Sequence, residues 1–364
     1  MLVNRFCKSF EQDSWAPLGL GGNPPEARGG FYWGYVDLLD VNGSGVVVIW
    51  GHGMPFSPGI LSAERAGRPV VARDAPSLCI AVYDRGRQVF YLLRDLSADA
   101  SIPDVLPMRE AQSPSFGGLT LAREPSALTL TFDVAIPGGA PLQGTVRVEG
   151  TALDLPAAGP AVHRWAPQLV GSATADLAAG SWRFTMSGRG YHDGNSSSLG
   201  LSELGIQRWI WGRTPHPDGE IVHYLLEPVT PGTPEQNHVL EIDWSGAVEH
   251  RFVEVERERN VRGKWGLRAP RSLRAGDLTI RHVSAFEDSP YYQRWLTSVT
   301  GPDGVEHAGV GEVVVIDRID RGAYMPLVRM ALDGPSPSMW VPLFCGPQHN
   351  RFQRLVRYWL GRSE

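Results

Sequence analysis

Turn-forming residues recur along the whole chain at intervals that leave room only for short extended segments. The 364 residues include 42 glycines and 29 prolines, spread over the full length. Between them lie apolar segments of strand character, such as Phe31–Asp40 and Val46–Gly53, which the turn residues Asn42–Gly45 separate. Short strands joined by short turns are typical of antiparallel hairpins, and repeated hairpins favour closure into barrels. The sequence therefore predicts an all-β fold.

The same strand-and-turn pattern begins again in the second half, and the length suits two domains better than one small barrel. We expect an N-terminal barrel over residues 1–165 and a C-terminal barrel over residues 166–364. In the second half, Ala178–Gly180 is predicted to be a hairpin turn. The tail Gln348–Arg362 carries apolar residues at the spacing of one helix face, which predicts a short C-terminal helix.

Composition excludes several classes of function. Charged residues make up 20% of the chain and the net charge is −5, which does not suit a nucleic-acid surface. The three cysteines, Cys7, Cys79 and Cys345, are too scattered for a disulfide framework or a zinc site, and they fit a reducing compartment. The histidine spacings match no metal motif and no phosphate-binding glycine loop is present, so we expect neither metal nor cofactor.

The N-terminal segment lacks the apolar stretch of a signal peptide, and no apolar run is long enough to span a membrane. We therefore expect a cytoplasmic protein. If its substrate is dissolved in a membrane, the protein would contact that membrane peripherally rather than cross it.

The segment Gly188–Asn195 holds the strongest candidate for acid chemistry. Tyr191 and Asp193 are two residues apart, so on a strand their side chains share a face and His192 points the other way. A carboxyl buried among apolar groups has a raised pKa and can donate a proton. The sequence Asp193-Gly194-Asn195 is also typical of a turn, in which the carboxylate only caps the backbone, and spacing alone favours that interpretation.

Tryptophan-rich segments lie on either side of this one. Trp209 and Trp211 share a strand face and would either wall a pocket or pack in an ordinary sheet core. His163 and Trp165 likewise share a face if their segment is extended. A single histidine is usually structural, and it acts as a proton relay or a base only when a partner lies nearby.

Together these segments resemble the carotenoid 1,2-hydratase (hydroxyneurosporene synthase) family. The resemblance covers about residues 29–330, and it rests on the order and approximate spacing of several motifs. The motifs that carry it are Phe31–Pro58, Pro76–Asp84, His163–Pro167, Trp182–Phe184, Gly188–Asn195 and Arg208–Arg213. The segments Ser289–Val299 and Gly311–Arg321 are similar to the barrel-closing parts of the wider lipocalin-like group.

The resemblance implies two lipocalin-like β-barrel domains, no cofactor, and acid chemistry. In the family this chemistry is assigned to a His, a Trp, a Tyr and an Asp, which correspond here to His163, Trp165, Tyr191 and Asp193. The family usually has histidine directly after the aspartate, whereas this chain has Gly194. That glycine opens space, which puts the family substrate in question more than the acid.

These observations lead to a mechanistic hypothesis. Asp193 protonates the terminal C=C bond of a hydrophobic isoprenoid or polyene, and aromatic rings stabilise the resulting tertiary carbocation. His163 orients the water that captures this cation. The residues expected to contact the substrate are Trp33, Phe56, Asn195, Trp209 and Trp211.

Two other functions fit the same residues. A cyclase or pericyclase would keep the cavity dry and let a second double bond react, and the loss of a side chain at Gly194 favours this slightly. A lipocalin-like carrier would bind a lipid or pigment without converting it. Labelled water separates hydration from cyclisation, and replacement of Asp193 separates an enzyme from a carrier.

Overall fold

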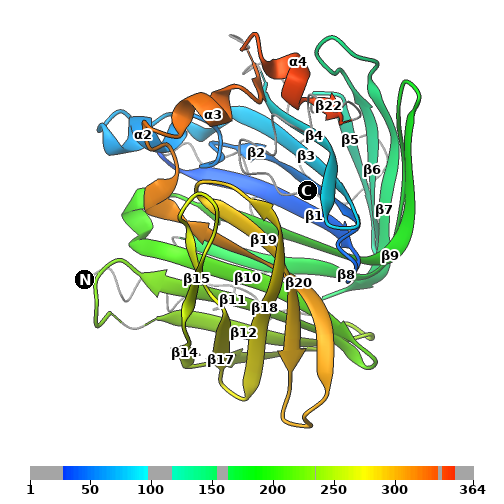
Figure 1. Ribbon diagram of the computed structural model, residues 1–364. Helices are drawn as coiled ribbons and strands as arrows, with labels where there is room; N and C mark the ends of the chain where they lie inside the picture. The colour runs from blue at the N-terminus through cyan, green and yellow to red at the C-terminus, as the bar shows by residue number, and fades with distance from the viewer. Residues whose placement is uncertain (1–27, 97–116, 154–162, 234, 335–337, 349–364) are drawn as a thin grey trace.

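The computed structural model describes residues 28–96, 117–153, 163–233, 235–334 and 338–348, and strands dominate these residues (Figure 1). They form two large antiparallel sheets, each curled into a half-barrel, and one small two-stranded sheet. The predicted all-β class is confirmed, and the curled sheets agree with a lipocalin-like fold. No described helix is long and apolar enough to cross a membrane.

The first sheet has eleven strands, and its path runs in the order β21-β4-β3-β2-β1-β9-β8-β7-β6-β5, with β22 also paired to β4. Nine of its strands come first in the chain: β1 (Phe31–Leu39), β2 (Gly45–His52), β3 (Pro76–Asp84), β4 (Arg87–Asp95), β5 (Leu119–Glu124), β6 (Ala127–Val134), β7 (Leu142–Ala152), β8 (His163–Ala179) and β9 (Trp182–Ser197). The other two, β21 (Leu332–Asp333) and β22 (Gly346–Pro347), come near the end of the described residues.

The second sheet has nine strands in the order β13-β12-β11-β10-β20-β19-β18-β17-β14. Their bounds are β10 (Ile206–His216), β11 (Gly219–Pro228), β12 (Gln236–Asp243), β13 (Val248–Phe252), β14 (Val255–Arg257), β17 (Ser272–Ala275), β18 (Leu278–Asp288), β19 (Tyr292–Thr300) and β20 (Glu306–Val315). The small sheet pairs β15 (Asn260–Arg262) with β16 (Arg268–Pro270).

The chain returns to the first sheet after β20. The returning segment contains η3 (Ile316–Arg318), α3 (Met325–Arg329), β21 (Leu332–Asp333), α4 (Val341–Phe344) and β22 (Gly346–Pro347). Both short strands pair with β4, so the C-terminal segment covers the edge of the first sheet. Near it lies α2 (Ile60–Arg65), and η1 (Ala72–Asp74) and η2 (Leu201–Leu204) are the other short helices (Figure 1).

The structure places the boundaries differently from the sequence pattern. Residues 165 and 166 lie inside β8, and the chain passes from the first sheet to the second between Ser197 and Ile206. The division into two independent domains stays a prediction. The helix predicted for Gln348–Arg362 lies outside the described residues, apart from Gln348 itself.

The long hairpin of β8 and β9 determines where the site forms. Its turn lies at Gly180, as predicted, where a positive φ of 60° suits glycine. The second predicted turn, at Asp193-Gly194-Asn195, is wrong, because β9 runs through these residues to Ser197. There β9 pairs with β1 on one side and with β8 on the other, so its backbone hydrogen bonds are made within the sheet.

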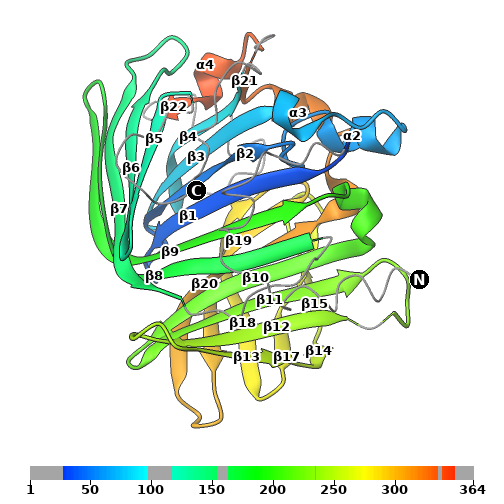
Figure 2. The ribbon, with the colours of Figure 1, turned by 180° about the vertical axis from the view of Figure 1, so that it is seen from behind.

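Three apolar cores result from strand alternation. One is made within the first sheet, one within the second, and the third is shared between the two. In β1, Val36 and Leu38 belong to the first core, whereas Trp33 and Tyr35 belong to the shared core. Figure 2 shows β1, β9 and β8 crossing the middle of the molecule next to β10. The residues of these strands that face the second sheet therefore define the space between the sheets.

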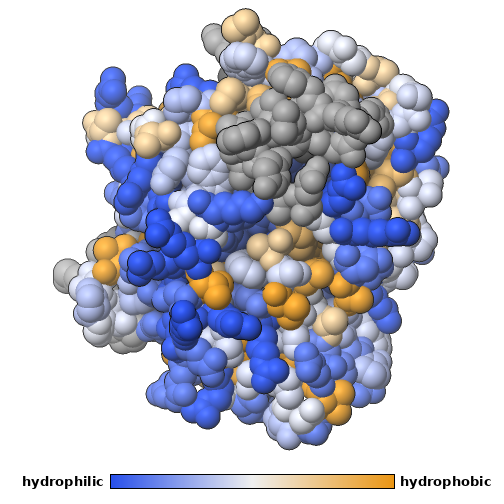
Figure 3. All heavy atoms as spheres, viewed as in Figure 1, coloured by the Kyte–Doolittle hydropathy of each residue, from blue (hydrophilic) through white to orange (hydrophobic). Residues whose placement is uncertain are grey.

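Most of the large aromatic side chains among the described residues lie inside the protein, whereas Phe252 and Trp340 are exposed. On the face drawn in Figure 3, the visible coloured residues are mostly hydrophilic, with apolar residues in small separate groups. Trp33, Trp165, Trp209 and Trp211 are each at most 6% exposed. The shared core thus gathers the rings that the sequence suggested as pocket walls.

Candidate active site

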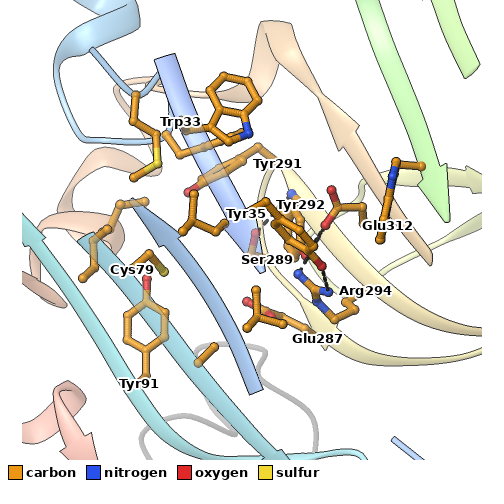
Figure 4. Close-up of a pocket in the computed structure, with 18 of the residues that line it drawn as sticks. Trp33, Tyr35, Cys79, Tyr91, Glu287, Ser289, Tyr291, Tyr292, Arg294 and Glu312 are labelled. Atoms are coloured by element: carbon orange, nitrogen blue, oxygen red, sulfur yellow. Dashed lines mark hydrogen bonds and ion pairs between the residues drawn. The ribbon is translucent and has the colours of Figure 1, made fainter. Parts of the chain in front are cut away.

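A cavity lies between the two large sheets, within the shared core (Figure 4). It has a volume of about 160 Å³ and mostly aromatic and aliphatic walls. Strands β1 to β4, β8 and β9 contribute to one wall, and β10, β11 and β18 to β20 to the other. Leu327, Val328 and Phe344 of the returning C-terminal segment also line it. The predicted contact residues Trp33, Phe56, Asn195, Trp209 and Trp211 all line this cavity.

Two rows of directly paired residues face each other across the cavity. Residues opposite one another in antiparallel strands share a face, so a whole row points to one side of a sheet. The row of the first sheet is Leu93, Cys79, Ile49, Tyr35 and Asp193. The row of the second sheet is Tyr224, Trp211, Glu312, Arg294 and Glu287. All ten line the cavity.

Asp193 is a buried carboxyl with an asymmetric set of partners. Its Oδ2 accepts hydrogen bonds from Trp165 Nε1 and from the Tyr191 hydroxyl, each at 2.8 Å. Its Oδ1 is buried and has no hydrogen-bond partner among the described residues. The predicted shared face of Tyr191 and Asp193 is thus present, and the carboxyl does not cap a turn.

Burial raises the pKa of Asp193 from 3.8 to about 8. The bonds from Trp165 and Tyr191 lower this pKa, and the negative charges of Glu312 and Asp37 raise it further. Near neutral pH the group is therefore a neutral acid. Because Oδ2 already accepts two hydrogen bonds, we place the proton on Oδ1, the oxygen left without a partner.

His163 lies behind the cavity wall rather than in it. The side chain is 5% exposed, and burial lowers its pKa to about 4, against a hydrogen bond with Asn195 that raises it. Its ring lies near those of Phe31 and Tyr224, with centroids 6.1 and 6.3 Å away. His163 is not among the residues that line the cavity, but Asn195 is. It is thus neutral and suited to holding Asn195 in place.

The aromatic walls surround the acid. The Trp211 ring lies 5.3 Å from Tyr191 and 5.4 Å from Tyr35, and Trp165 lies 4.7 Å from Tyr224, measured between ring centroids. Trp209 continues this wall, with its centroid 5.5 Å from Phe56 and 6.3 Å from Trp33. The predicted shared face of Trp209 and Trp211 therefore forms one side of the cavity.

Gly194 lies in β9 between two residues that line the cavity. Asp193 and Asn195 both line the cavity, so in the strand Gly194 faces the opposite side of the sheet. On that side His192 stacks on Trp50, with ring centroids 5.8 Å apart. The position that lacks a side chain therefore faces away from the acid, and the effect of Gly194 on the choice of substrate stays a prediction.

Several charged residues near the site were missed by the sequence reasoning. Arg213 is 1% exposed and donates hydrogen bonds to Asp37 at 2.8 Å and to Glu220 at 2.6 Å. These three residues come from β10, β1 and β11, so the ion cluster joins the two sheets. The sequence signal that could have found this cluster is a charged residue within an apolar strand, as Asp37 is in β1. Such a residue, when buried, needs a partner of opposite charge.

A second cluster is centred on Arg294, which lines the cavity itself. Its guanidinium donates to the Tyr35 hydroxyl at 3.1 Å and to Glu312 Oε2 at 3.2 Å, as Figure 4 shows. The Tyr292 hydroxyl donates to the same Glu312 oxygen at 2.7 Å. Further along, the Tyr83 hydroxyl donates to Glu287. The cavity therefore has aromatic walls, the neutral Asp193 acid, one guanidinium–carboxylate pair, and two further carboxylic side chains, Glu287 and Asp288.

The described residues contain no group of three or more His, Cys, Asp or Glu side chains that could hold a metal ion. The carboxyl groups and aromatic rings that line the cavity can support proton transfer next to aromatic faces.

Comparison with solved structures shows the fold. A protein described as AttH from Nitrosomonas europaea aligns with 83% of this chain and 97% of its own, at 12% identity and a TM-score of 0.55. CghA aligns with 86% of this chain and 97% of its own, at 12% identity and a TM-score of 0.51. The structure of CghA with Sch210972 aligns with 85% of this chain and 97% of its own, at 13% identity and a TM-score of 0.50.

No curated protein sequence matches this chain significantly. A family model does, and its description is carotenoid hydratase CrtC. The match covers residues 71–338, which is most of the chain and includes Trp165, Tyr191 and Asp193 as well as the whole second sheet. The chain therefore belongs to the carotenoid hydratase CrtC family.

Proposed function

We propose that this protein adds water to a terminal C=C bond of a hydrophobic isoprenoid or polyene, without a cofactor, by protonating the alkene from Asp193. Membership in a hydratase family supports addition of water to a C=C bond. The observation that carries the finer proposal is the Asp193 carboxyl, which lines an aromatic cavity, has a raised pKa, and has no hydrogen-bond partner at Oδ1 among the described residues.

The first step forms a carbocation. The Asp193 O–H bond breaks, its proton bonds to the terminal alkene carbon through the π electrons, and a tertiary cation remains on the neighbouring carbon. The faces of Trp165 and Trp211, which line the cavity, would stabilise this cation, by about 2 kcal/mol or more for a desolvated ring. Tyr191 is fully buried and not among the lining residues, so it acts through its hydrogen bond to Asp193. The hydrogen bonds from Trp165 and Tyr191 are already directed at the carboxylate that forms, so little reorganisation accompanies the step.

The second step captures the cation with water. The water oxygen forms the C–O bond and one of its O–H bonds breaks. The released proton restores the Asp193 carboxyl, and the product is a tertiary alcohol. We assign His163 the positioning of this water through Asn195, because Asn195 lines the cavity and His163 lies behind it. His163 is then a positioning residue rather than one that touches the substrate.

The test compares the wild type with Asp193→Asn and with Asp176→Asn, a control at an exposed position of β8. Each protein is incubated with a lycopene-like and a short prenyl substrate, in oxygen-18 water and in heavy water. We expect one oxygen-18 and one deuterium in the product, a loss of at least about a hundredfold in Asp193→Asn, and no change in the control.

Three results would overturn the proposal. A product of unchanged mass without labelled oxygen would show a cyclase. Tight binding of an unchanged polyene would show a carrier. Turnover of Asp193→Asn at the wild-type rate would remove Asp193 as the acid.

A further inference from the structure

Besides Asp193, the cavity is lined by three carboxylic side chains that the acid step does not use, and Glu312 is one of them, with Glu287 and Asp288. Glu312 lies on β20, directly opposite Trp211 of β10 and Arg294 of β19, so its side chain points to the cavity face. Its Oε2 accepts hydrogen bonds from Tyr292 and Arg294. The described residues form no hydrogen bond to its Oε1.

The two carboxyl groups have different hydrogen-bond partners. Asp193 receives hydrogen bonds only from neutral donors, whereas Glu312 is paired with the Arg294 guanidinium. Burial raises the pKa of both groups, and Arg294 and Tyr292 oppose that rise at Glu312. The Arg294 guanidinium thus favours the ionised form of Glu312, whereas Asp193 has no positively charged partner that would favour its carboxylate. Two carboxylates whose environments separate their pKa values are typical of an acid and a base in one site.

The geometry places them on opposite walls. Asp193 belongs to the row of the first sheet and Glu312 to the row of the second. The Trp211 ring, next to Glu312 in its row, lies against Tyr191, which donates to Asp193. The charge of Glu312 contributes to the pKa of Asp193, so the two act on the same part of the cavity.

We infer that Glu312 is a catalytic base that removes a proton from the attacking water, an inference that rests on the proposed hydration. The Asp193 O–H bond breaks as the C–H bond forms. The water oxygen then bonds to the cationic carbon while one of its O–H bonds breaks, and that proton passes to Glu312 Oε1. Transfer of this proton back to Asp193 restores both groups, so the sum is alkene plus water giving alcohol. Before water adds, the Glu312 charge also stabilises the cation.

Three other groups are less well placed for this role. Glu287 lines the same cavity and accepts a hydrogen bond from Tyr83, but it lies two strands beyond Glu312 in the row, further from Asp193. His163 is a weak base at its lowered pKa and does not line the cavity. Asp288 also lines the cavity, but it lies on β18 next to Glu287 and already accepts hydrogen bonds from Gln293 and the Lys264 backbone. Among these three carboxylic side chains, Glu312 is the one directly opposite Trp211.

The test compares Glu312→Gln with Glu287→Gln and with Glu306→Gln, a control at an exposed glutamate on the same strand β20. Two products are measured in heavy water that also carries oxygen-18: the labelled alcohol, and deuterium in the recovered alkene. Deuterium enters that alkene when Asp193 delivers a proton and the cation then loses one. We expect Glu312→Gln to lose alcohol by at least about a hundredfold and to keep the exchange into alkene. Asp193→Asn should lose both.

The outcomes separate this inference from the proposed function. Wild-type alcohol formation by Glu312→Gln, loss of exchange together with alcohol, or the same phenotype in Glu287→Gln instead would each overturn the role of Glu312. Full activity of Asp193→Asn would overturn the hydration mechanism as a whole.

A folding control addresses the buried ion pair. Glu312→Gln leaves Arg294 without its anion, whereas Glu312→Gln combined with Arg294→Met removes the pair as a unit. We expect the double variant to unfold at a higher urea concentration than Glu312→Gln and to show the same loss of alcohol. Recovery of alcohol formation in the double variant would refute the role of Glu312 as a base.

Discussion

Replacing Asp193 with asparagine should abolish activity and stabilise the protein near neutral pH. Asparagine has nearly the same shape, and its amide oxygen can accept the bonds from Trp165 and Tyr191. The folded protein holds the Asp193 proton up to about pH 8, whereas the unfolded chain loses it near 3.8. Because the folded state binds the proton more tightly, stability from this group is lost as pH rises from about 4 to about 8.

The magnitude follows from the pKa values. Each pH unit between them costs about 1.4 kcal/mol, so the cost at about pH 7 approaches about 4 kcal/mol. Between about pH 5 and pH 7 the free energy of unfolding of Asp193→Asn should rise relative to wild type by about 3 kcal/mol. Other groups, such as the buried His163 and His192, titrate in both proteins and cancel in this difference.

Urea denaturation of both proteins at several pH values measures this difference, with activity recorded on the same samples. As pH rises, the urea concentration at the midpoint of unfolding should increase for Asp193→Asn relative to wild type. A difference in unfolding free energy that is the same at about pH 5 and pH 7 would show that Asp193 ionises normally in the folded protein, and the reasoning would fail.

Four further outcomes can be checked. Activity should fall above about pH 8, as Asp193 ionises. Tyr191→Phe removes a bond that lowers this pKa, so it should move the fall to higher pH, and an unshifted pH–rate profile would contradict this. Arg213→Met leaves two buried carboxylates unpaired and should lower the free energy of unfolding by about 3–5 kcal/mol in urea; a loss near zero would show that they are solvated. Gly190→Ala would put a methyl group 2.5 Å from a β8 alanine and should cost about 1–3 kcal/mol, whereas Gly188→Ala, whose nearest contact is 3.2 Å, should cost less.

The strands of this protein could be predicted because their signals are local. The turn at Gly180 follows from residues adjacent in sequence, and so does the shared face of Tyr191 and Asp193. The same locality misled the prediction at Asp193-Gly194-Asn195, which has the composition of a turn. In the folded chain, pairing with β1 and β8 satisfies the backbone there and keeps it extended.

The charged half of the site could not be predicted in the same way. Glu312 and Arg294 lie in different strands, and nothing in either local sequence shows that the two residues pair. Their pairing depends on the register of β19 against β20, and their access to Asp193 depends on the second sheet packing on the first.

The sequence by itself determined the all-β class, the alternation that places Asp193 and Tyr191 on the same strand face, and the aromatic composition of the walls. Only the tertiary structure decided that this face is buried against another sheet, and that Glu312 and Arg294 complete the cavity. The physical reason is that strand periodicity is a property of neighbouring residues. A shifted pKa depends instead on burial and on charges brought together from distant parts of the chain.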